Sequence, residues 1–274
     1  MEENLNQEVP KMSPTEPEEV ETSHTDKLVG VFSEPGNTFS QMAKTGPTTS
    51  DWIIPILVVI VVAILSNFIM MSNPVIKTSI MEKQMEQFEK NFDEMVKNGQ
   101  MTEAQKEEQM EQMRERMDQG MGAQMIFSVI GIVIFTFITF FVISGVFFLF
   151  AKFVLKGQGT YKEAMSAYGL PHYIVVIQII VMVILALVMN KFFQSVSVAD
   201  FVDADKATIT GFLLGKLDVF SIWFYAVISI GFAKMFKSAS TGKYFATIFG
   251  LWIGFGLLFF FLAKAVPFLR WFGF

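Results

Sequence analysis

Residues 125–151 read MIFSVIGIVIFTFITFFVISGVFFLFA and contain no charged side chain. A bilayer core about 30 Å thick needs roughly 20 apolar residues in a helix that rises about 1.5 Å per residue. This stretch is long enough to cross a membrane, with a tilt or with protruding ends. It therefore indicates an integral membrane protein.

The composition of the whole chain supports that class. Of its 274 residues, 52% are apolar and 17% are charged, whereas about 25% charged residues are usual in a soluble domain. The net charge of −5 gives no attraction to a phosphate backbone, so we expect no nucleic-acid partner. The chain has no cysteine, which excludes disulfide frameworks, thiolate nucleophiles and Cys-ligated zinc.

Four further uncharged windows lie outward from this stretch, so the expected fold is an all-α membrane protein with five transmembrane helices. The expected spans are 52–71, 125–153, 171–190, 218–236 and 244–264. The fourth is short unless Lys234 lies at its edge. The other expected segments are an acidic disordered tail (1–30), an interfacial helix (31–51), a cytoplasmic loop helix (154–170), a loop with an interfacial helix (191–217), a short loop (237–243) and an aromatic interfacial tail (265–274).

Five spans place the two termini on opposite sides of the membrane. Two lysine clusters border the connections after the second and fourth spans, and the net charge of the connections favours a cytoplasmic amino terminus. The count of lysine and arginine alone does not, because residues 72–124 add seven bases. Charge alone leaves the orientation undecided. The clusters are Lys152, Lys156 and Lys162, and Lys234, Lys237 and Lys243.

Residues 72–124 form a hydrophilic insertion whose pattern predicts an extramembrane helical hairpin. Its first half carries an apolar stripe spaced alternately by four and three residues, typical of one helix face. Asn98-Gly99 ends that helix, and Thr102 with Gln105 forms a capping box that begins a second one. The stripe residues are Met81, Met85, Phe88, Phe92 and Met95, followed by Met110, Met113 and Met117.

The methionines of this insertion allow two readings. The spacing in MEQMRERMDQGM (110–121) resembles that used for soft Cu(I) or Ag(I). Methionine is also a flexible filler and a good helix former in a two-helix seam, and no Cys or His supports a metal. We favour the packing reading and assign no metal site and no cofactor.

The sequence contains no catalytic or phosphate-binding motif of the types GxxxxGK[ST], GxSxG or HExxH. Its two histidines are His24, in the expected tail, and His172, at a membrane surface. We therefore expect a protein that is not an enzyme. The interiors of the expected spans also lack Asp and Glu, which disfavours an ion-coupled transporter.

Polar and small residues within the spans have packing roles first. The carboxamides of Asn67, Gln178 and Asn190 are expected to form hydrogen bonds between helices. The alternative is that they line the polar route of a small channel or transporter. Small residues recur every four positions on the fifth span, a face that lets another helix approach closely and leaves a homo-oligomer open. They are Ala246, Gly250 and Gly254.

The most specific string is KGQGTYKEAMSAYGLPHYIVV (156–176). Thr160 and Glu163 form a capping box, Gly169 stands where a helix stops, and Pro171 opens the next span. This string resembles the Yip (Ypt/Rab-interacting protein) family, particularly its bacterial members. FSEPGNTFSQMA (32–43) is similar to the family's entry segment, and residues 217–243 resemble its fourth span.

The resemblance implies five spans, a cytoplasmic amino terminus and a bacterial plasma membrane location, with the hairpin outside. Eukaryotic relatives act in membrane traffic and bind prenylated Rab-type GTPases. This chain departs from them in its long hairpin and lacks an Asp-Leu-Tyr-Gly-Pro element before the first span, which argues against a Rab-type partner. The family-motif residues are Gly159, Tyr161, Glu163, Tyr168, Gly169, Pro171, Asp218 and Trp223.

These observations predict a non-enzymatic membrane scaffold that contacts the lipid bilayer. Its cytoplasmic surface around residues 161–171 is expected to recruit a protein partner or to organise lipid, because a motif-rich loop lies beside two lysine clusters that suit anionic headgroups. A channel or transporter is the first alternative, and soft-metal binding by the hairpin is the second.

Overall fold

The computed structural model describes residues 23–119 and 121–265, and within these ranges every regular element is helical apart from one isolated β-bridge between Ser197 and Asp218. Side chains are described for residues 23–115 and 127–264. The helices are α1 (His24–Ser33), α2 (Pro35–Thr45), α3 (Ser50–Ser72), α4 (Pro74–Lys97), α5 (Glu103–Gln119), α6 (Met121–Leu149), the π-helical turn η1 (Phe150–Val154), α7 (Tyr161–Gly169), α8 (His172–Met189), α9 (Val198–Phe201), α10 (Ile209–Lys216), α11 (Val219–Met235) and α12 (Thr241–Ala265).

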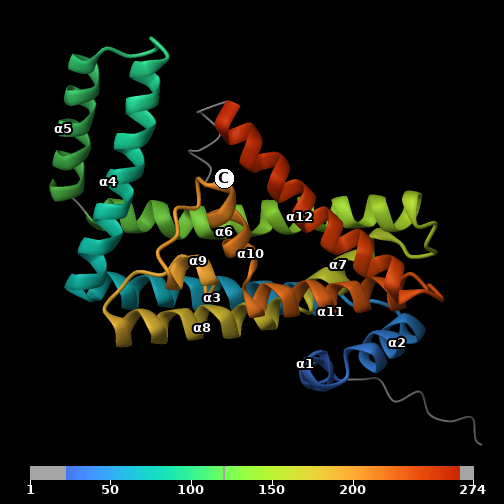
Figure 1. The fold of residues 1–274 in the computed structure, drawn as a ribbon. Helices are drawn as coiled ribbons and strands as arrows, with labels where there is room; N and C mark the ends of the chain where they lie inside the picture. Colours follow the sequence, from blue (N-terminus) through green and yellow to red (C-terminus); the bar gives the residue numbers. More distant parts are fainter. Residues whose placement is uncertain (1–22, 120, 266–274) are drawn as a thin grey trace, which may run out of the picture.

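Four helical stretches are long and apolar enough to cross a membrane: Ser50–Ser72, Phe127–Val154, Tyr161–Met189 and Thr241–Lys264. Helices α3, α6 and α8 run roughly parallel to one common axis, and α12 crosses them obliquely (Figure 1). Helix α11 has 17 residues, about 25 Å, which is shorter than the roughly 20 residues of a typical span. The all-helical class agrees with the sequence, and the count of five spans stays a prediction.

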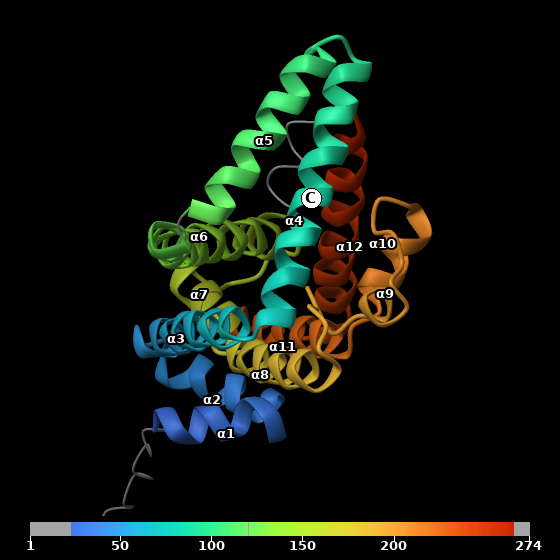
Figure 2. The same ribbon diagram turned by 90° about the vertical axis from the view of Figure 1, so that its left-hand side faces the viewer.

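Helices α4 and α5 lie side by side and stand away from the axis of α3, α6 and α8 (Figures 1 and 2). Pro74 opens α4, and the side chain of Asn73 caps it by accepting hydrogen bonds from the backbone N–H groups of Val75 and Ile76. Lys106 of α5 forms an ion pair with Asp93 of α4. Their location outside the bilayer stays a prediction.

The amino-terminal part departs from the expected segments. Helix α1 begins at His24, inside the predicted tail, because Ser23 and Asp26 form a capping box. Two helices replace the single interfacial helix expected over 31–51, since Pro35 cannot continue α1 and begins α2 instead. Residues 1–22 and 266–274, which include most of both expected tails, lie outside the described residues.

The buried apolar side chains form two groups. The larger one joins α1, α2, α3, α6, α7, α8, α11 and α12, and it lies where α3 begins and α6 and α11 end; we call this the α7 end. The smaller one lies where α3 and α8 end and α4 begins; we call this the α4 end. The smaller group consists of Met70, Ile76, Ile80, Val183, Ala186 and Phe193.

The segment between α8 and α11 folds back along the bundle. Asp200 in α9 accepts hydrogen bonds from Ser197 (2.9 Å) and from Lys206 (2.9 and 3.0 Å), which closes a compact loop. The chain then reaches Asp218, whose Oδ2 accepts a 2.7 Å hydrogen bond from Gln178. Gln178 is about two turns into α8, so α11 begins beside the interior of α8 rather than beside its end.

Candidate functional site

Two loops meet at the α7 end and bring distant parts of the sequence together. The backbone N–H of Gln158 donates a 3.1 Å hydrogen bond to the carbonyl of Phe236. Gly157 and Gly159 lie against Phe236, and a Cβ at either position would come within 2.9 Å of that side chain. The motif residue Gly159 is therefore needed for the close contact of the two loops.

The next motif residues begin α7 and fasten it to α6. The backbone N–H of Thr160 donates to the carboxylate of Glu163 over 3.0 Å, and the two side chains complete a capping box. The Tyr161 hydroxyl donates to the carbonyl of Phe141 over 3.0 Å and lies 3.0 Å from the hydroxyl of Ser144. Helix α7 is thus held at its first residue.

Tyr168, Gly169 and Pro171 are buried. The ring of Tyr168 packs against Phe140 and against His172, at centroid distances of 5.5 and 4.8 Å. A Cβ on Gly169 would lie 2.5 Å from the Cα of Trp52. These three motif residues build the frame of the α7 end, and they do not themselves form its exposed surface.

A buried ion pair joins three elements at this end, and the sequence analysis missed it. Asp51 is fully buried, and its carboxylate lies 2.7 Å from the ammonium of Lys27 in α1. Its oxygens also accept hydrogen bonds from Thr48, through the backbone N–H (2.7 Å) and the hydroxyl (2.8 Å), and from Ser166 of α7 (3.4 Å). A buried pair is tolerated when its remaining polar atoms are satisfied in this way.

The sequence signal for this cluster is weak. Thr48 and Asp51 have the spacing of a helix-start cap, but Lys27 stands in a segment whose composition suggests a tail. In the sequence, Asp51 is simply the charged residue that precedes the first expected span, 52–71. The pairing becomes visible only when α1 is seen against α3.

The two remaining motif residues, Asp218 and Trp223, lie at the start of α11. Helix α7 packs against a later turn of α11, at Gly231. Asp218 is buried and caps α11 through the backbone N–H of Phe220 (2.9 Å) and the hydroxyl of Ser221 (3.1 Å). Trp223 packs against Phe32 of α1, with a centroid distance of 5.6 Å. Both residues connect α11 to its neighbours.

The carboxamides of the expected polar route lie in three different places. Gln178 is bound to Asp218, as a hydrogen bond between helices. Asn190 is exposed and ends α8 in a left-handed conformation (φ 49°). Asn67 lines a cavity at the α4 end. The structure does not bring these three side chains together.

The small-residue face of α12 is open in this chain. Ala246, Gly250 and Gly254 are exposed, and a Cβ on either glycine would meet nothing within 4 Å among the described residues. The face therefore packs against no helix in the described part of the chain, and self-association through it stays a prediction.

The exposed surface of the α7 end is basic. Four lysines flank the two loops that Gln158 and Phe236 connect, and all four are exposed. Glu163, the acidic residue nearest to them in sequence, is engaged in the cap of α7. The lysines are Lys156, Lys162, Lys237 and Lys243.

Comparison with known proteins identifies one family. A family model described as the Yip1 domain matches residues 29–263. The match covers all the motif residues and confirms the resemblance seen in the sequence. Searches of the curated proteins and of the solved structures gave no match.

Proposed function

The chain belongs to the Yip1 domain family, and on that premise we propose that it is a non-enzymatic integral membrane scaffold whose α7 end recruits a protein partner or organises anionic lipid. The observation that carries this proposal is the meeting of Lys156, Lys162, Lys237 and Lys243 on one end of the bundle. Each lysine near an anionic leaflet contributes about 1 kcal/mol of attraction. The buried motif residues serve this surface by holding its loops in place.

The proposed orientation places the α7 end and the amino terminus in the cytoplasm of a bacterium. Lysines collect on the cytoplasmic side of plasma-membrane proteins, and α1 is tied to the α7 end through Lys27 and Asp51. Helices α4 and α5 then lie on the outer side. This arrangement gives the basic surface access to cytoplasmic proteins and to anionic headgroups together.

The channel alternative has less support from the geometry. A polar route needs polar side chains that converge along one path, and Asn67, Gln178 and Asn190 occupy separate environments. The soft-metal alternative rests on the methionine spacing alone.

In-cell photo-crosslinking tests the scaffold proposal. A photoreactive residue at the exposed position Gln158 or Ala239 should capture a defined protein or anionic lipid in intact cells. Lys237→Glu/Lys243→Glu should abolish the capture, whereas the matched pair Lys90→Glu/Lys97→Glu on α4 should leave it unchanged. Capture of this chain alone from both positions would reject recruitment, and solute flux through reconstituted vesicles would favour a channel.

A further inference from the structure

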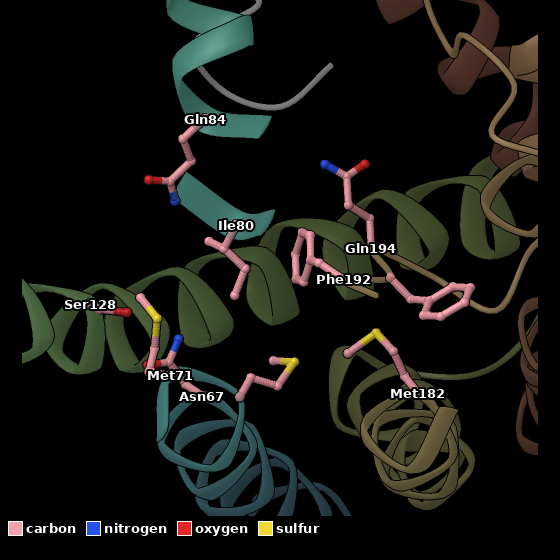
Figure 3. A pocket seen from close by; sticks show the side chains of 10 residues that line it. Asn67, Met71, Ile80, Gln84, Ser128, Met182, Phe192 and Gln194 are labelled. Atoms are coloured by element: carbon pink, nitrogen blue, oxygen red, sulfur yellow. The ribbon is translucent and has the colours of Figure 1, made fainter. Parts of the chain in front are cut away.

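A cavity of about 370 Å³ lies at the α4 end, far along the chain from the basic loops. Helices α3, α4, α6 and α8 and the segment after α8 contribute to its walls (Figure 3). Its volume is at the lower limit of typical ligand sites, about 300 Å³. The lining residues used below are Asn67, Gln84, Gln194, Met71, Met182 and Phe192.

The polar groups of this cavity are the hydroxyl of Ser128 and three carboxamides, of which Asn67 is half-buried and Gln84 and Gln194 are exposed at the rim. Within residues 23–115 and 127–264, the side chains of Asn67 and Gln84 form no hydrogen bond. Gln194 uses its oxygen to accept from Lys206, over 3.3 Å, and its amide N–H groups stay available. Asn67 belongs to α3, a candidate span, where an unsatisfied polar group is costly.

The remaining walls are soft and apolar. Met71, Met182 and Phe192 line the cavity, and the lining residues carry no formal charge. Besides Lys206, which donates to Gln194, another lysine stands at its margin: the ammonium of Lys83 donates a 3.2 Å hydrogen bond to the carbonyl of Phe192 and lies 5.7 Å from the centre of its ring. The cavity thus combines neutral hydrogen-bond donors, flexible apolar surface and a positive charge at its margin.

When the end of α3 is placed at the membrane surface, the cavity falls at the depth of the ester region of a bilayer. Asn67 precedes the last residue of α3, Ser72, by about 7.5 Å along the helix. The polar layer between the hydrocarbon core and the membrane surface is roughly 5 to 8 Å thick on each side. A carboxamide at this level meets ester carbonyls and glycerol oxygens, which can accept its N–H groups.

We propose that this cavity binds one glycerophospholipid. The amides of Asn67 and Gln84 donate to the ester carbonyls, the first methylenes of an acyl chain contact Met71 and Met182, and the phosphate faces Lys83. The rest of the lipid extends over apolar surface, where Phe68 is 45% and Phe127 is 72% exposed. Water could satisfy the amides, but it would wet the thioethers and the ring.

Native mass spectrometry of the full-length protein, purified from nanodiscs containing phosphatidylglycerol and phosphatidylethanolamine, tests this proposal. The wild-type chain should retain one lipid, and Asn67→Leu/Gln84→Leu should lower that occupancy about tenfold. Gln87→Leu changes another exposed glutamine of α4, one that does not line the cavity, and should behave as wild type. Circular dichroism and size-exclusion chromatography verify that each variant is folded.

Two further measurements make the result decisive. Lys83→Gln should reduce retention of phosphatidylglycerol more than that of phosphatidylethanolamine, because the former has a net negative charge. A phospholipid with a photoreactive acyl chain should label residues 182–194. Equal retention by the wild type and the double variant, or labelling that avoids this segment, would overturn the proposal. The basic loops take no part in these measurements, so the outcome is separate from that of the scaffold proposal.

Discussion

At the scale of single residues, Gly169 packs so closely against Trp52 that it leaves no room for a side chain. A Cβ there would lie 2.5 Å from a backbone atom that cannot move aside easily. Gly169→Ala should therefore destabilise the protein by about 1–3 kcal/mol, measured as a lower unfolding temperature in detergent. Gly36→Ala in α2, where a Cβ meets nothing within 4 Å, is the control. Equal unfolding temperatures of both variants would show that α7 does not pack on α3 as described.

The ion pair of Lys27 and Asp51 makes a second prediction at this scale. Lys27→Met leaves the carboxylate of Asp51 buried without its counterion, which should cost about 3–5 kcal/mol. Lys27→Met/Asp51→Asn removes both charges and should recover part of that loss. Thermal unfolding of both variants in the same detergent measures the difference. A double variant less stable than Lys27→Met would contradict the assignment.

At the scale of elements, α1 should respond to pH. His24 lies 2.7 Å from the hydroxyl of Tyr173, and burial lowers the pKa of its imidazole, with Asp51 raising it and Lys27 lowering it to a smaller extent. The docked helix therefore favours neutral His24. Detached α1 binds more protons as the pH falls below about 6.5, so docking is complete above that value and weakens below it.

Hydrogen exchange of residues 24–33 measures this effect. Protection, corrected for intrinsic rates, should decrease between pH 7.5 and pH 5. His24→Gln, which does not titrate, should make protection independent of pH over this range. If protection in the wild type does not change with pH, the protonation of His24 does not control the docking of α1.

The elements also show what a sequence can predict. Helices α3, α6, α8 and α12 follow from long uncharged windows, and the start of α7 follows from Thr160 and Glu163, because these signals are local. Helix α1 could not be predicted from local signals, because Lys27 is stabilised by a carboxylate on another helix. The position of Asp218 could not be predicted either, because it depends on Gln178, a residue 40 positions away.

At the scale of the whole molecule, the count of spans decides where each end lies. With five spans and a cytoplasmic amino terminus, reporters fused at residues 157 and 239 should read as cytoplasmic, and reporters at 99 and 203 as external. The contrast between 203 and 239 tests whether the short α11 crosses the bilayer. The same reading at 203 and 239 would reduce the number of spans and revise the orientation.

The ion pair that attaches α1 also determines how this helix can leave. If α1 moved a few ångströms away from α3, the ammonium of Lys27 would have neither its carboxylate nor a shell of water, and the carboxylate of Asp51 would likewise be unpaired and unsolvated. An arrangement in which α1 is only partly separated from α3 is therefore higher in free energy than both the docked and the fully released state. Release of α1 is consequently an all-or-none event. Its barrier is the cost of separating the two charges before water can solvate them.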